Sequence, residues 1–188
     1  MLSQNISRPM RTFNYRTIQG PSFLNGIPEA AEWADFKEKI LCDKSKSLSE
    51  LWFEKVIESG GIPDRKDFAV EEFIKFGTNI FIGKLTDDGK WLTTYCGSGI
   101  ADSVGLDASN KTFEDYAKPK TQKFWEDNLK MLTDDGKVYL EYYSFEYDNH
   151  EIKHCAAINL PLYSDGSPFP NVNLSYESFN REDLYPSD

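Results

Sequence analysis

The central part of the chain contains short apolar runs typical of strands and segments in which apolar residues recur at helical spacing. Residues 79–85 and 91–96 have the pattern of strands, and the Asp-Asp-Gly segment within 86–90 is typical of a hairpin turn. Apolar positions at helical spacing predict a helix over 119–132, ended by the turn residues 134–136. Three further strands are predicted at 137–147, 151–163 and 172–179.

Two helices are predicted before these strands. The first spans 27–41 and has Pro28 where a first helical turn accepts proline. Its apolar side chains recur at helical spacing at Trp33, Phe36 and Ile40. The second spans 48–59, and we expect Ser47 and Glu50 to form its capping box.

The strand at 137–147 is apolar or aromatic on both faces. One face carries Val138, Leu140, Tyr142 and Ser144. The other carries Tyr139, Tyr143, Phe145 and Tyr147. Because a sheet face open to water is normally polar, something is expected to cover each face. We therefore predict a homodimer whose interface joins this aromatic face to Trp33, Phe36 and Ile40; the alternative is that the N-terminal helices fold over the sheet of their own chain.

The most distinctive stretch is 51–82, in which a helix, a Gly-Gly end, a PDRKDF link, a second helix and a strand follow one another: LWFEKVIESGGIPDRKDFAVEEFIKFGTNIFI. It resembles the opening of the PAS-domain family, in the compact single-domain form common in alphaproteobacteria. Further similar segments are WLTTYCGSGI at 91–100, VGLD at 104–107, KTFED at 111–115 and NLPLYSDG at 159–166. The family usually has arginine where this chain has Thr94, and glycine where it has Asn110, a residue that tolerates the left-handed conformation.

The resemblance implies an α+β fold in which five antiparallel strands carry helices on one face. It also implies the division of the chain: an N-terminal extension over 1–47, a PAS-like domain over 48–180 and a C-terminal tail over 181–188. A length of 188 residues suits one domain. The sequence lacks an apolar run of membrane-spanning length and a signal-peptide pattern, so we expect a cytoplasmic protein without membrane insertion.

Charge argues against nucleic acid as a partner. The chain has 21 Lys and Arg against 31 Asp and Glu, a net charge of −10, which repels a phosphate backbone. Residues 1–28 are basic, with arginines but no acid, and we expect them to form a loosely ordered tail.

The sequence offers few chemical groups in a catalytic pattern. His150 and His154 do not form a helical zinc pair, and we expect His154 to be a hydrogen-bonded core residue. Haem-binding PAS domains place a histidine on the long helix, and LOV-type flavin domains carry an NCRFLQ-like motif; this chain has neither. The segment 97–99 is interpreted as a glycine turn. We therefore expect no cofactor, no bound metal and no enzymatic activity.

A candidate ligand pocket lies between the predicted sheet and its helices. Its expected lining residues are Tyr95, Phe113, Phe124, Tyr142, His154, Ala156 and Ile158. The alternative for the same residues is a filled core, the commoner role of aromatic positions at such spacings.

Three hypotheses for function follow. The first is a stand-alone PAS-like regulatory module that acts through contacts with an unidentified signalling protein. The second is a sensor in which a small molecule bound in the PAS cavity biases such a contact. The third is an enzyme of unrecognised type.

Overall fold

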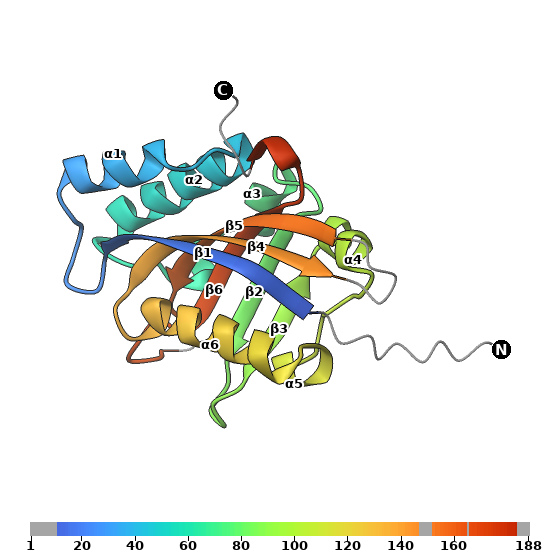
Figure 1. The fold of residues 1–188 in the computed structure, drawn as a ribbon. Coiled ribbons are helices and arrows are strands. Elements are labelled where there is room, and N and C mark those ends of the chain that lie inside the picture. The colour runs from blue at the N-terminus through green and yellow to red at the C-terminus, as the bar shows by residue number, and fades with distance from the viewer. Residues whose placement is uncertain (1–10, 147–151, 165, 184–188) are drawn as a thin grey trace.

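The computed structural model describes residues 11–146, 152–164 and 166–183. One antiparallel sheet of six strands, ordered β1-β4-β5-β6-β2-β3, runs through its centre (Figure 1). The strands are β1 (Arg11–Ser22), β2 (Ile80–Leu85), β3 (Trp91–Cys96), β4 (Lys137–Glu146), β5 (Ile152–Leu162) and β6 (Val172–Ser178). The α+β class and the antiparallel sheet expected from the sequence are confirmed.

Helices lie on both sides of this sheet. They are α1 (Ala30–Glu38), α2 (Asp43–Ser59), α3 (Val70–Ile74), α4 (Ser98–Val104), α5 (Phe113–Tyr116) and α6 (Pro119–Thr133), with short 3-10 turns η1 (Arg65–Asp67) and η2 (Arg181–Asp183). Figure 1 shows α1 and α2 above the sheet and α5 and α6 below it. The five strands expected within the PAS-like range are present as β2 to β6, but β1 adds a sixth strand to the sheet and helices cover both faces, so the expectation of a five-stranded sheet with helices on one face is wrong.

The sixth strand comes from the segment expected to be a loosely ordered tail. Strand β1 pairs with β4 from Ser22 opposite Lys137 to Arg11 opposite Glu146. Its pairing shifts register between Phe13 and Arg16, where Asn14 has a positive φ of 55°. This irregularity interrupts the alternation of faces by which a strand is recognised in a sequence.

The N-terminal helices cover the sheet face that carries Val138, Leu140 and Ile158. Trp52 of α2 is fully buried there, and its Nε1 donates a hydrogen bond to the Pro161 carbonyl of β5 at 2.9 Å. The residues proposed for a dimer interface, Trp33, Phe36 and Ile40, belong to this same core and are at most 4% exposed. The apolar stripe is thus covered within one chain, as the intramolecular alternative requires.

Helix α2 begins earlier than predicted. It starts at Asp43 after Cys42, so Ser47 lies inside the helix and is not its cap. The predicted end is confirmed, because Gly60 terminates the helix in the left-handed conformation with φ of 74°.

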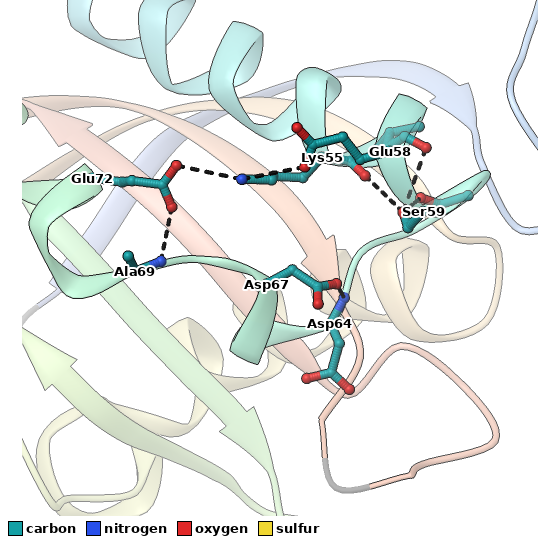
Figure 2. A network of polar contacts seen from close by, with 9 residues as sticks. Lys55, Glu58, Ser59, Asp64, Asp67, Ala69 and Glu72 are labelled. Atoms are coloured by element: carbon teal, nitrogen blue, oxygen red, sulfur yellow. Dashed lines mark hydrogen bonds and ion pairs between the residues drawn. The ribbon is translucent and has the colours of Figure 1, made fainter.

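The distinctive PDRKDF link after α2 is a pair of tight caps (Figure 2). The Asp67 carboxylate accepts from the Asp64 backbone N–H at 2.8 Å, while the Asp64 carboxylate accepts from the N–H of Lys66 at 3.0 Å. Glu72 caps α3 through the Ala69 N–H at 2.8 Å and reaches Lys55 of α2 at 3.5 Å. The motif therefore fixes the conformation of the link between α2 and α3, which is a structural role.

Two further local predictions have different outcomes. Gly97 is not in a turn conformation that requires glycine, since its φ is −63°. Instead, a Cβ at this position would lie 2.0 Å from the Thr78 carbonyl oxygen, so close backbone approach requires glycine there. Asn110 has φ of 60°, which confirms that it adopts the left-handed conformation.

Candidate functional site

A cavity of about 90 Å³ lies between the sheet and helices α4, α5 and α6. Most of its wall is apolar, and six aromatic rings contribute to it. The rings come from Phe81, Phe113, Tyr116, Trp125, Tyr139 and Tyr143. Phe113, Tyr116 and Trp125 contact one another at centroid distances of 5.2 to 6.2 Å, so α5 and α6 form one continuous apolar wall.

Two carboxylates approach the cavity from the sheet. Glu141 on β4 pairs with Ala157 on β5, and Ala157 pairs in turn with Glu177 on β6. The three residues therefore form one row across the sheet, and all three line the cavity. Neighbouring strands lie about 5 Å apart, so the Cα atoms of the two acids are about 10 Å apart. The small side chain of Ala157 leaves the space between the two carboxyl groups open.

Glu141 is an acid in a strand that is otherwise apolar on this face. It is only 5% exposed and accepts a hydrogen bond from Nδ2 of Asn128 on α6 at 2.9 Å. Loss of hydration disfavours its charged form and raises the pKa of Glu141 to about 7, although the Asn128 hydrogen bond opposes this change.

Glu177 keeps some solvent-exposed surface, yet burial of its carboxyl group is the largest influence on its protonation. Burial, followed by repulsion from Glu141, raises the pKa of Glu177 to about 8. The Cys155 thiol donates to it from 3.9 Å, measured between Sγ and Oε2. Near neutral pH both groups therefore hold their protons far more readily than a carboxyl group in water.

Two buried amides complete the polar part of the wall. Asn173 donates through Nδ2 to Oδ1 of Asn159 at 2.8 Å, and both residues are 4% exposed. Among the described residues, Asn159 Nδ2 and Asn173 Oδ1 have no hydrogen-bond partner; the Asn159 amide lies near Glu141 without the geometry of a bond. Exchanging N and O in both amides again leaves one donor and one acceptor unpaired, so the finding does not depend on their assignment.

The other ionisable groups at the cavity are held neutral. Burial raises the pKa of Cys96 to about 11 and raises the pKa values of Tyr116, Tyr139 and Tyr143. The Tyr116 hydroxyl lies 3.1 Å from Oγ1 of Thr93. The described residues that line the cavity include no lysine, arginine or histidine, so the two acids lack a cationic partner there.

Of the seven residues predicted to line a pocket, Phe113 alone lines this cavity. Tyr142, Ala156 and Ile158 lie on the opposite sheet face, and His154 shares their side of β5. The alternation of side chains along β4 and β5 assigns each residue to one of the two sheet faces. Because both faces are buried, it does not identify the face that holds the cavity. Tyr95 is 48% exposed, and Phe124 stacks on Tyr15 of β1 with centroids 3.7 Å apart.

The Nδ1 atom of His154 lies 2.8 Å from Oγ of Ser144, so the expected hydrogen bond is present, but the residue is half-buried and is not a core residue. His150 and Tyr147 lie outside the described residues.

The aromatic residues proposed for a dimer interface are also covered within the chain. Tyr139 and Tyr143 line the cavity, and Phe145 is fully buried beside Phe179. The premise that they form an exposed patch is therefore wrong, because α4 to α6 cover this face.

The sequence interpretation missed Glu141, Asn159, Asn173 and Glu177. One signal for them was present: a polar residue in an apolar run of a strand that is buried on both faces.

A second, wider hollow lies at the other end of β2. It is an open groove of about 420 Å³ bordered by Asp64, Arg65, Lys66 and Lys84. Arg65 donates to the Phe68 carbonyl at 3.1 Å and stacks over Phe73, and Lys66 lies 3.8 Å from Asp64. Since these charges already have partners within the chain, the cavity at Glu141 and Glu177 is the stronger candidate site.

Within the described ranges, no group of three or more His, Cys, Asp or Glu side chains is arranged to hold a metal ion. In the same part of the chain, no helix combines the length and apolarity needed to cross a bilayer.

The arrangement is therefore a largely apolar chamber with six aromatic side chains in its wall and with two carboxyl groups and two partly paired amides at its floor. Such a chamber suits the binding of a small polar molecule. Comparison with known proteins adds no identity to this site: no family model, no curated protein sequence and no solved structure matches the chain.

Proposed function

We propose that this protein is a small-molecule-binding regulatory module, in which occupancy of the cavity at Glu141 and Glu177 biases a contact with another protein. The observation that carries the proposal is the unpaired donor and acceptor on Asn159 and Asn173 beside these acids. Buried polar groups normally have partners, and a bound molecule would supply them. A filled core would leave these atoms uncompensated at a cost in stability.

The order of elements supports a PAS-like module. Strands β2 and β3 come first, helices α4 to α6 follow, and strands β4 to β6 complete the sheet. That is the order implied by the resemblance of residues 48–180 to PAS domains. The cavity lies between those helices and the sheet, where a PAS ligand is expected.

The proposal is tested by a native mass spectrum of the freshly purified chain, together with a thermal-shift screen of small metabolites. We expect either a retained molecule that denaturation releases, or a metabolite that stabilises the fold. A ligand at about 100 times its dissociation constant contributes about 2.7 kcal/mol, which such a screen detects. A spectrum without an adduct, a screen without a shift and a crystal structure with the chamber filled by side chains would together exclude the proposal.

A second candidate function, self-association as a cytoplasmic homodimer, draws on exposed apolar side chains near the α2–α3 junction. Ile57 of α2 and Val70 and Ile74 of α3 are 55 to 72% exposed, and the Lys55–Glu72 ion pair joins the two helices (Figure 2). We predict a dimer by light scattering at micromolar concentration that the double substitution Val70→Asp and Ile74→Asp converts to a monomer. A wild-type monomer over that range excludes this candidate.

A further inference from the structure

We infer that the ligand of this cavity is a small organic cation, an alkylammonium of about three to five non-hydrogen atoms whose N–H groups bond to Glu141 and Glu177. This inference rests on the proposed binding function and narrows it to one chemical class. It follows from the charge, the wall and the size of the chamber.

The ionisable charge of the chamber near neutral pH comes from its two acids. The donors near them in the described part of the chain are neutral: the amides of Asn128 and Asn159 for Glu141, and the Cys155 thiol for Glu177. Buried carboxylates without a cation are costly, and a ligand that brings a positive charge with several N–H donors converts that cost into attraction. The unpaired Oδ1 of Asn173 offers a third acceptor to the same ligand.

The wall favours a cation for a separate reason. Aromatic faces carry negative electrostatic potential and attract ammonium groups within about 6 Å of a ring centroid. Six aromatic side chains, Trp125 among them, line the same cavity as Ala157. The same rings bury the methylene groups of an alkyl chain, so an amine with a short apolar body complements both parts of the wall.

The volume limits the size. A cavity of about 150 Å³ accommodates benzene, so a chamber of about 90 Å³ suits roughly three to five non-hydrogen atoms. Ethylammonium, propylammonium and ethanolammonium fall in this range.

Protonation supplies an independent readout. The ionisable groups that face the chamber are the two glutamates, Cys96, Cys155 and three tyrosines. Burial raises the pKa values of the thiols and phenols, which stay neutral near pH 7. The carboxyl groups alone exchange protons there, so binding a cation should release protons to the buffer.

The test is isothermal titration calorimetry of the full chain with ethylammonium, propylammonium and ethanolammonium near pH 7, in two buffers of different ionisation enthalpy. We expect at least one of them to bind with proton release, and 1-propanol not to bind at the same concentration. Glu177→Gln and Glu141→Gln should each weaken binding by roughly ten- to a hundredfold, because a charge-assisted hydrogen bond is lost. Glu71→Gln, the same change at an exposed position of α3, should leave the affinity unchanged.

Three outcomes overturn the inference. If 1-propanol or acetamide binds and the amines do not, the chamber is a ligand site but not for cations, and the proposed function stands. If the amines bind equally well to both Gln variants, they bind elsewhere. If neither amines nor neutral molecules bind and no adduct is found in the native mass spectrum, the inference and the proposed function fail together.

Discussion

Glu141 and Glu177 face one cavity from strands β4 and β6, with Ala157 of β5 between them. Burial raises the cost of ionising both acids, and repulsion from Glu141 adds to that cost for Glu177. The pair therefore links the protonation of the protein to its stability and, under the proposed function, to ligand binding in the chamber.

The first prediction concerns pH. The pKa of Glu141 rises from 4.5 to about 7 on folding, so between these pH values the folded chain binds more protons than the unfolded chain. Stability is therefore lost as the pH rises through this window and levels off above it. Glu141→Gln, which still accepts from Asn128, should remove that loss. We expect it to stabilise the protein by on the order of 2 kcal/mol more at about pH 8.5 than at about pH 5.5, measured by urea unfolding.

Glu71→Gln is the matched control for this experiment, because it removes one acid from an exposed site. It should change the stability by the same small amount at both pH values. A Glu141→Gln variant whose stability parallels the wild type across the range would show that Glu141 ionises normally in the folded chain.

The second prediction concerns space at the floor of the chamber. Ala157→Val places two methyl groups between the acids, in a strand that favours β-branched residues. We expect stability to change by less than about 1 kcal/mol, while the affinity for any cavity ligand falls at least about tenfold. His154→Ala, on the opposite side of β5, should leave that affinity within about twofold. Equal effects of the two substitutions in calorimetry would place the ligand outside this chamber.

The third prediction tests the close approach of the backbone at Gly97. A Cβ there would meet the Thr78 carbonyl oxygen at 2.0 Å, so Gly97→Ala must separate β2 from the start of α4. We expect a loss of about 3 kcal/mol in the free energy of unfolding. Gly61→Ala has no heavy atom within 4 Å of the new Cβ and should be nearly neutral. Similar denaturation midpoints for the two variants would contradict the geometry at Gly97.

The fourth prediction concerns the attachment of the N-terminal helices. Trp52→Phe removes the bond to the Pro161 carbonyl and leaves a gap in a fully buried position. We expect a cost of about 2–4 kcal/mol. Trp125→Phe, at a half-buried position in the cavity wall, should cost less. Thermal unfolding of both variants would refute the prediction if Trp125→Phe were the more damaging change.

Much of the central fold could be predicted from the sequence, because its strands and α6 carry strong local patterns. Strand β3 was placed at its observed bounds, and α6 and β5 were placed within about one residue at each end. Strand β1 was missed because the bulge at Asn14 interrupts its alternation and its partner lies far along the chain. Pairing of that kind leaves no local signal.

The site was harder to predict for a different reason. Alternation along β5 separates Ala156 and Ile158 from Ala157 and Asn159, but both sets are buried. Which set faces a cavity depends on how α6 packs against the sheet. The alternation of side chains along a strand contains no information about this packing.

The position of β1 also bears on the order in which the molecule assembles. Lys137 of β4 donates a hydrogen bond to the side chain of Gln19 of β1, although the two residues lie 118 positions apart in the chain. A ribosome makes β1 long before β4 exists, and bringing such distant segments together is entropically slow. Strand β1 therefore cannot pair until β4 has been synthesised. We expect the docking of β1 to be a late folding event that completes the edge of the sheet.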